Sequence, residues 1–502
     1  MRALAIGRQK LGLALFALAL GCGKTSNAGA PPGDGGSPNA GAPSGDGGSP
    51  NSEQGGTAAG GSPSSPSGGV ASAASAGRNS MAVGGSSGVA GSGQVMLGGS
   101  PAGGAAGAAA APYKLCRGDR PVLSRDQYLA LVAEECTEIM GALTISQDSD
   151  LSDLPALKTL TLVGRQMTIS HNPLLTALPG FPALESVGDV LTVDDNPALT
   201  SLALPKLRSA RVFSIAGSPL HDLSGLGALE MVPDGFTLSG PIEALTGLNL
   251  ASVGYLDISL PRLKSLSGLE ALRQVDRLSL AEALVSDLTG LHDLAVRAFT
   301  LSDCPNLTSL QGLGSGVVVQ EWNLYNNGHM TSLNGLPLAG LKGLSIQGLD
   351  QLSSLVALTE VESLSYLGLL RLPALSNLHG LERLHDVSGD LSFQSLPQLS
   401  ALSELSALRT VDSLTLSSLA KLKDLGGLSS LTHAYHGLFL NDNSVLSSLA
   451  PFLSWPNGVV EGSMQIRDNP LLPQCQADQL ASTQASAFGC ALCDGNLPGA
   501  CP

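Results

Sequence analysis

Two stretches of sequence decide the fold: residues 167–175, MTISHNPLL, and residues 191–199, LTVDDNPAL. Each begins with an apolar residue, a threonine and a second apolar residue, and each has an asparagine three positions after the second apolar residue. Side chains alternate along a β-strand, so the two apolar residues share one face and the threonine lies on the other. The pattern therefore predicts a short strand that is buried on one face and followed by a tight turn.

The strand pattern recurs fifteen times, with a mean period of about 23 residues. A sustained period in this range is typical of a solenoid, in which each coil buries its apolar face against the next coil. We therefore expect a β-solenoid of about fifteen coils built from short parallel strands. The predicted strand cores are residues 143–145, 167–169, 191–193, 213–215, 236–238, 256–258, 278–280, 299–301, 322–324, 344–346, 367–369, 391–393, 414–416, 438–440 and 464–466.

A polar residue stands three positions after the end of many of these strands. A buried polar side chain at this point satisfies backbone groups of neighbouring turns that would otherwise lack partners. In four successive coils the position is leucine, which predicts apolar packing and a different turn shape there. The polar residues are Asn172, Asn196, Asn327, Asn443 and Asn469, with Asp148, Ser218 and Cys304 as substitutes, and the leucines are Leu349, Leu372, Leu396 and Leu419.

These repeats resemble those of bacterial leucine-rich-repeat lipoproteins and of the receptor L domain, the ligand-binding β-solenoid of insulin and growth-factor receptors. The resemblance is carried by residues 136–145, CTEIMGALTI, together with residues 169–175 and 193–199, and it covers about residues 136–472. It implies a leucine-rich-repeat fold with disulfide-capped ends, while leaving the ligand undefined because this architecture serves many binding roles. One long solenoid and two or three fused L domains both accommodate fifteen coils.

Residues 1–22 have the features of an export signal. Basic residues precede an apolar run over residues 11–21 that is too short to span a bilayer. The run ends in Ala-Leu-Gly-Cys, which resembles the bacterial lipobox. The resemblance implies lipid attachment at Cys22, a membrane partner and a location at the outer membrane or cell surface. Cleavage after Ala19 is the alternative, and it predicts a secreted protein.

The rest of the chain divides by composition. Residues 23–112 are almost entirely Gly, Ala, Ser and Pro, which predicts a disordered tether because too little apolar side chain is present to offset the entropy of ordering. Residues 113–142 are expected to form an N-terminal cap with a short helix near residues 125–135, where Ser124 and Gln127 have capping-box spacing. Residues 143–472 form the predicted solenoid, and residues 473–502 form a cysteine-rich C-terminal cap.

The chain has eight cysteines. Cys22 is assigned to lipid and Cys304 to the ladder position, so six remain in the two caps. An exported protein meets an oxidising compartment, which favours disulfides over a zinc site. Cys116 and Cys136 are expected to pair, whereas the last four allow three pairings. The disulfide candidates are Cys116, Cys136, Cys475, Cys490, Cys493 and Cys501.

The net charge and the sequence motifs limit the classes of function that are possible. The formal net charge is −15, and this acidity disfavours nucleic acid as a partner. No nucleophile motif, paired-carboxylate signature or metal-ligand spacing stands out, so we expect no catalysis, no cofactor and no metal site. The leading interpretation is a surface protein that binds a protein or a glycan. The alternatives are a structural envelope lipoprotein and, less favoured, a solenoid enzyme that processes polysaccharides.

The outward residues of the predicted strands indicate where a ligand would bind. Most middle positions are Ser or Thr, which are ordinary on a solvated strand face. Tyrosine and arginine gather in the central coils, and both are favoured binding anchors because they combine large contact area with hydrogen bonding. The candidate ligand-binding residues are Tyr255, Asp257, Arg277, Glu321, Asn323, Tyr325 and Tyr366.

Overall fold

The computed structural model describes residues 113–146, 155–178, 180–455, 459–484 and 490–499. The predictions for the export signal, for lipid attachment at Cys22 and for the tether fall outside these ranges. So do those for Asp148 and Cys501. The described part of the chain forms the solenoid and the segments at its two ends.

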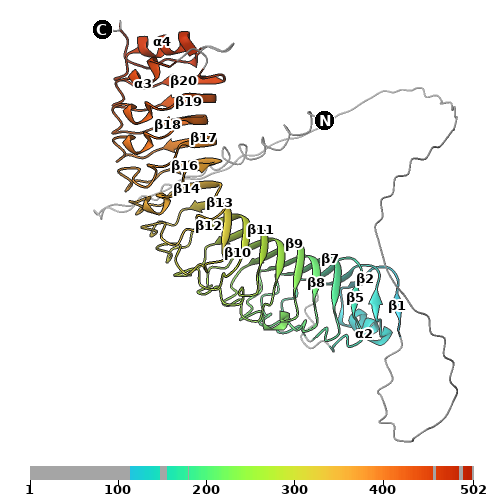
Figure 1. Cartoon of the computed structure of the whole chain (residues 1–502). Helices are drawn as coiled ribbons and strands as arrows, with labels where there is room; N and C mark the ends of the chain where they lie inside the picture. The colour runs from blue at the N-terminus through green and yellow to red at the C-terminus, as the bar shows by residue number, and fades with distance from the viewer. Residues whose placement is uncertain (1–112, 147–154, 179, 456–458, 485–489, 500–502) are drawn as a thin grey trace, which may run out of the picture. The chain divides into compact units, whose positions relative to one another are not determined.

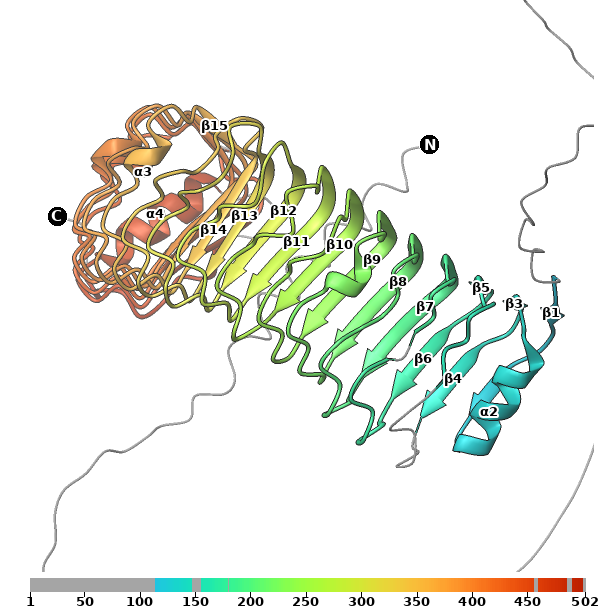
Figure 2. The same cartoon turned by 90° about the horizontal axis from the view of Figure 1, so that it is seen from below.

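A parallel β-sheet runs through the described residues, and each strand pairs with the strand of the next coil (Figures 1 and 2). Fifteen strands of this sheet contain the fifteen predicted strand cores, which confirms the predicted β-solenoid. They are β4 (Leu143–Ser146), β6 (Met167–Ser170), β7 (Ser186–Asp194), β8 (Ser209–Ala216), β9 (Met231–Ser239), β10 (Ser252–Ser259), β11 (Gln274–Ala281), β12 (Ala295–Ser302), β13 (Val318–Tyr325), β14 (Gly343–Gln347), β16 (Tyr366–Leu370), β17 (Asp386–Gln394), β18 (Thr410–Ser417), β19 (His433–Asn441) and β20 (Ser463–Arg467).

Shorter elements complete the coils. The strand β2 pairs with β4 and β21 pairs with β20, so the main row of strands extends by one strand at each end. The short strands are β1 (Leu115–Cys116), β2 (Arg120–Val122), β3 (Glu138–Ile139), β5 (Leu162–Val163), β15 (Ser363–Leu364) and β21 (Cys490–Leu492). The helices are α2 (Arg125–Glu134), α3 (Ala450–Leu453) and α4 (Gln474–Gln484), and the 3-10 turns are η2 (Ser224–Leu226), η3 (Val356–Leu358), η4 (Ser403–Leu405) and η5 (Gly426–Leu428).

The core is a continuous column of apolar side chains inside the coils. On β10, Leu256 and Ile258 are fully buried while Asp257 between them faces outward. Behind the strands, leucines recur at every third residue and are buried, and in several coils a 3-10 turn, with three residues per turn, brings such leucines to the same side. One such series is Leu220, Leu223, Leu226 and Leu229. A fully buried leucine contributes roughly 1.5–3 kcal/mol, so each coil stabilises its neighbours through several such residues.

The buried asparagines form a ladder between successive coils. The Asn196 side-chain amide donates to the Ile169 carbonyl at 3.0 Å and to its own coil at the Asp194 carbonyl, also at 3.0 Å. Its Oδ1 atom accepts from the backbone N–H of Asn172 at 3.2 Å. Asn443 repeats this arrangement with the Leu416 carbonyl and the Leu419 N–H, both at 3.0 Å. The ladder thus satisfies backbone groups at the end of each preceding strand.

The prediction of a different turn shape in the four leucine coils is wrong. In the asparagine coils a left-handed residue precedes the ladder position, as at Asp195 with φ 49°. The leucine coils keep this conformation, for example at Arg371 with φ 53° and at Ser418 with φ 57°. Arg371 donates its N–H to the Gln394 carbonyl of the next coil at 3.0 Å. This bond joins backbone to backbone, so the turn is held whichever side chain follows it.

The N-terminal cap has the predicted helix and disulfide. Ser124 caps α2, because its hydroxyl accepts the Gln127 N–H at 3.3 Å. Tyr128, a residue of α2, is buried, and its hydroxyl donates to the Pro155 carbonyl at 2.8 Å. Cys116 and Cys136 form a disulfide with a Cα–Cα distance of 5.8 Å. At the other end α4 lies beside the last coils (Figure 1), and its residues Ala477 and Leu480 are buried.

Replacing one ladder asparagine tests this account of the fold. Asn196→Ala leaves the Ile169 carbonyl and the Asn172 N–H buried without their partner, and each unsatisfied group costs about 1–3 kcal/mol. We expect a loss of about 2–5 kcal/mol in the free energy of unfolding, measured by urea denaturation. Ser218→Ala is the matched control, because the Ser218 hydroxyl makes a single bond, to the Ala216 carbonyl at 3.2 Å. Equal losses for the two variants would contradict the ladder.

Candidate ligand-binding face

The outward residues of the sheet stand in three columns. In each strand we call the residue before the first buried core residue the leading position, the one between the two core residues the middle position, and the one after the second the trailing position. On β10 these are Tyr255, Asp257 and Ser259. The strands pair in parallel register, so equivalent positions of neighbouring strands lie about 4.8 Å apart. Each column therefore presents a row of side chains across the coils.

The first group of predicted ligand-binding residues lies on β10 and β11. Tyr255 pairs directly with Arg277 in the leading column, and Asp257 lies two residues further along β10. The Tyr255 ring occupies the space above Gly235 on β9, where an added Cβ would lie 2.0 Å from it. A side chain at Gly235 would displace the ring. Tyr255 is nonetheless 40 % exposed, so it offers an aromatic surface to a ligand.

The second group lies on β13 and β16. Glu321, Asn323 and Tyr325 are the three outward residues of β13, and the Tyr325 hydroxyl donates to Asn323 Oδ1 at 3.2 Å. The Tyr366 ring lies over Gly343 on β14, where an added Cβ would be 2.2 Å away. Burial of Tyr366 and the nearby Glu321 carboxylate raise the pKa of this phenol well above its usual value. The hydroxyl therefore remains a hydrogen-bond donor throughout the physiological range.

Strand β12 separates the two groups. Its outward residues are Ala298, Thr300 and Ser302, which are all small. The structure thus places the predicted residues on one face, but in two clusters that are separated by the small side chains of β12.

Arg297 is a charged residue of this face that sequence reasoning missed. It precedes the leading position of β12, and its guanidinium bridges the two neighbouring strands. Nε lies 2.8 Å from Asp276 Oδ1, and Nη1 lies 3.5 Å from Glu321 Oε2. Hydrogen bonding from Arg297 lowers the pKa of the Asp276 carboxyl. Arg211 makes the same kind of bridge between Asp189 and Asp234, at 3.4 and 3.3 Å.

Phe439 is a second residue that sequence reasoning missed. It occupies the middle position of β19, is half-buried and leans over Gly437 of the same strand. The signal was available, because Phe439 stands between the core residues Leu438 and Leu440 where most other coils have Ser or Thr.

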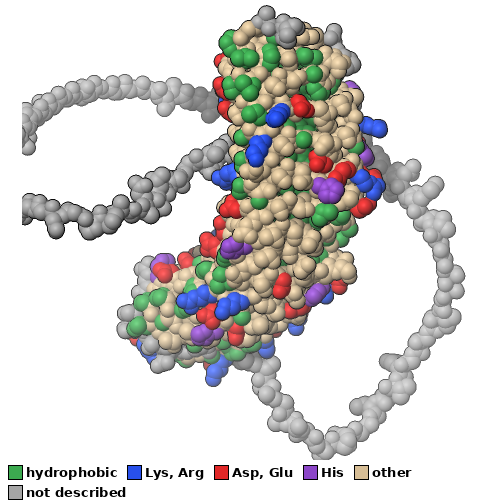
Figure 3. All heavy atoms as spheres, turned by 90° about the vertical axis from the view of Figure 1, so that its left-hand side faces the viewer, with side chains coloured by type: hydrophobic (Ala, Val, Ile, Leu, Met, Phe, Trp, Pro, Cys, Tyr) green, Lys and Arg blue, Asp and Glu red, His purple; other side chains and the backbone are tan. Residues whose placement is uncertain are grey.

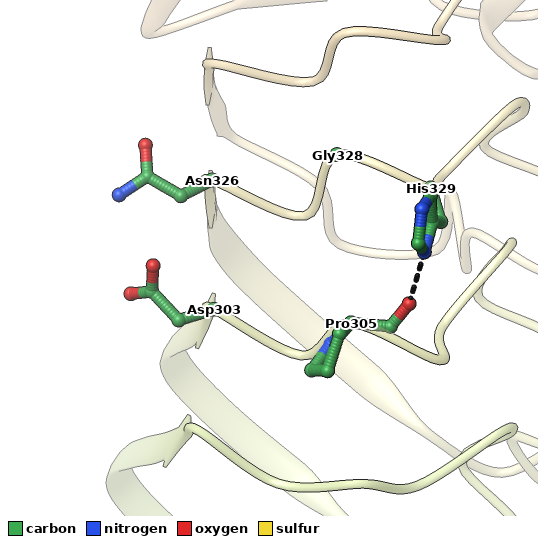
Figure 4. Close-up of a pocket in the computed structure, with 5 residues that line it drawn as sticks. All are labelled: Asp303, Pro305, Asn326, Gly328 and His329. Carbon is green, nitrogen blue, oxygen red and sulfur yellow. Dashed lines mark hydrogen bonds between the residues drawn. The ribbon is translucent and has the colours of Figure 1, made fainter. Parts of the chain in front are cut away.

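A small hollow opens at the carboxyl ends of β12 and β13 (Figure 4). It measures about 250 Å³ and is lined by Asp303, Pro305, Asn326, Gly328 and His329. His329 Nδ1 lies 2.6 Å from the Pro305 carbonyl oxygen, while Asp303 and Asn326 extend side by side from neighbouring turns. The titratable side chains that line this hollow, Asp303 and His329, are exposed to solvent.

Charged side chains of both signs are scattered over the face shown in Figure 3. Among the described residues, the one grouping with metal-ligand proximity is Cys116, Glu134 and Cys136. Both sulfur atoms of this grouping belong to the disulfide, so neither is available as a thiolate. The His436 ring pairs with Asp412, and the His433 ring stacks on Tyr435 with centroids 5.2 Å apart.

The remaining cysteines divide as expected where the structure describes them. Cys475 and Cys493 are both disulfide-bonded. The side chain of Cys490 and the whole of Cys501 lie outside the described residues. Cys304 is a buried free thiol at the ladder position, and burial raises its pKa to about 11.

Protein-family models give no match to the chain, and no curated protein matches its sequence. The resemblance to leucine-rich lipoproteins and to the receptor L domain therefore remains a prediction. Within the described ranges, the chain contains no helix long and apolar enough to cross a membrane.

The state of Cys304 can be measured by alkylation. Burial raises the pKa of the Cys304 thiol to about 11, so little of the reactive thiolate is present at pH 8 in the folded protein. We expect iodoacetamide to leave Cys304 unlabelled in the folded protein and to label it fully in denaturant without reductant, with Cys304→Ser as the blank. Under the same denaturing conditions, labelling of Cys116 or Cys136 would refute the N-terminal disulfide.

Proposed function

We propose that the protein is a non-catalytic binding protein, held at the bacterial cell surface by lipid at Cys22, whose solenoid binds a protein or a glycan. The observation that carries this proposal is the change of the outward columns in the central strands. The leading column has Val190, Val212 and Gly235 on β7 to β9, whereas it has Tyr255 and Arg277 on β10 and β11. Recognition needs such a departure from a uniform surface.

The charge arrangement favours binding over catalysis. A polysaccharide-processing enzyme needs cations and carboxylates free to act on substrate. Arg211 and Arg297 are instead each held between two carboxylates of neighbouring strands. A purely structural envelope lipoprotein is the second candidate, and it predicts no ligand for this face.

The lipid anchor has a direct test. Several acyl chains hold a protein far more firmly than one, so the wild-type protein should partition into the detergent phase. Cys22→Ser removes the attachment point and should move the protein into the aqueous phase. If both forms partition into the aqueous phase, the protein is secreted rather than anchored.

The ligand-binding face is tested once a glycan array or a pull-down with the purified protein yields a ligand. Tyr255→Ala, Arg277→Ala and Tyr325→Ala should each weaken binding by about 1 kcal/mol or more, or roughly fivefold in Kd, because truncating a binding anchor removes contact area and hydrogen bonds. Thr168→Ala, in the middle column of β6, serves as the control. Wild-type affinity in all three folded variants would place the site elsewhere, and the absence of any ligand would favour the structural alternative.

A further inference from the structure

The second half of the strand face differs in chemistry from the first. From β13 onward, side-chain amides enter the middle and trailing columns, where β7 to β12 have none. A primary amide offers both donors and an acceptor, whereas Ala offers neither and Ser offers one short hydroxyl. The amide residues are Asn323, Gln347, Gln394, Asn441 and Gln465.

The middle column holds only small residues between β14 and β18. They are Ser345, Gly368, Ser392 and Thr415, which are in register on neighbouring strands. An added Cβ at Gly368 would meet only the Ser345 hydroxyl, at 3.8 Å, so the space above this glycine is open. Asn323 on β13 and Phe439 on β19 are the first larger side chains at the two ends. This row of small residues spans five strand spacings from β13 to β19, roughly 24 Å.

Larger side chains border the row on both sides. Tyr366 and Leu370 are the leading and trailing residues of β16, with Gly368 between them, and both are half-buried. Gln347 and Gln394 stand beside Leu370 in the trailing column. The Gln394 amide donates to Ser392 Oγ at 2.8 Å, which leaves its carbonyl oxygen free to accept another bond.

Few charged residues stand in this part of the face. In the three columns from β13 to β20 the charged residues are Glu321, Asp390 and Arg467. Glu321 lies 3.5 Å from Arg297, and Arg467 lies 3.8 Å from Asp468. A polyanion or polycation would therefore find little complementary charge here.

We propose that this row, residues of β13 to β19 centred on Gly368, binds a neutral polysaccharide laid across the strands. The proposal rests on the binding function above and names the chemical class of its ligand. Sugar hydroxyls donate and accept hydrogen bonds, as do the bordering amides. The electron-rich faces of the Tyr366 and Phe439 rings attract positively polarised C–H groups. A protein partner is less suited, since protein interfaces are also anchored by arginine and the three columns from β13 to β19 contain none.

The experiment measures retention of the whole protein on neutral polysaccharides (cellulose, xylan, dextran, mannan and chitin) and on charged ones (heparin, polygalacturonate and chitosan) by affinity electrophoresis and pull-down. We expect retention by at least one neutral polymer, and we expect it to persist in about 1 M NaCl because no charge attraction is there to be screened.

The most decisive variant places a large side chain in the row of small residues. Gly368→Leu should weaken retention by about tenfold or more, because the leucine side chain would occupy the space above this position where the polysaccharide is proposed to lie. An added Cβ there meets no atom closer than 3.8 Å, so the backbone can carry the new side chain. Thr192→Leu is the matched control, since it enlarges the same column in the Ser/Thr half of the face. Phe439→Ala and Gln394→Ala should each weaken retention by about fivefold. Circular dichroism and thermal unfolding establish that each variant is folded.

Two results would overturn the proposal. The first is that no neutral polymer retains the protein, whether or not charged polymers do. The second is that Gly368→Leu and Thr192→Leu affect retention equally. If a protein ligand is then found whose binding depends on Tyr255, Arg277 and Tyr325, the proposed binding function survives without the glycan. If no ligand of either class is found, the binding function fails as well.

Discussion

The rest of the structure depends on the hydrogen bonds that join each coil to the next. Each turn after a strand leaves backbone groups inside the solenoid, where water cannot reach them. Asn196 satisfies such groups on the preceding coil through the Ile169 carbonyl and the Asn172 N–H. The left-handed residue before it adds a second bond, from Asp195 N–H to the Ala216 carbonyl of the following coil at 3.1 Å. A coil that slipped along its neighbour would break both sets at once, so the strand cores from β4 to β20 keep a common parallel register.

Because the register is fixed, the residues that stabilise the fold and the residues that are free to contact a ligand occupy different positions of each strand. Inward positions such as Leu256 and Ile258 must be apolar because each packs against the equivalent residues of two neighbouring coils. Outward positions contact mainly solvent and other side chains of the same face. Tyrosine can enter the leading column where the adjacent strand has glycine, as Tyr255 does over Gly235 and Tyr366 over Gly343. These two tyrosines of the leading column therefore depend on the residue at the paired position of the neighbouring coil.

The sequence alone was sufficient for the strand positions, because alternation of apolar residues and the 23-residue period are both local signals. It was insufficient for the leucine coils. There the expectation of a new turn assumed that the ladder side chain shapes the turn, whereas the backbone bond from Arg371 to Gln394 holds it. Arg297 was missed for a different reason. It precedes the regular three-residue pattern, and its role appears only when Asp276 and Glu321 are seen on either side of it.

The same register limits how charge can be used. Equivalent positions lie about 4.8 Å apart, so a column of one sign would repel itself along its whole length. The protein instead alternates signs across neighbouring strands, with Arg211 between Asp189 and Asp234 and with Arg297 between Asp276 and Glu321. Each bridge therefore keeps a single net negative charge, and the three outward columns from β13 to β20 contain just three charged residues. Under the proposed binding function, a ligand of this face would be distinguished mainly by hydroxyls, amides and aromatic rings, which makes the appearance of amides from β13 onward the most informative change along the solenoid.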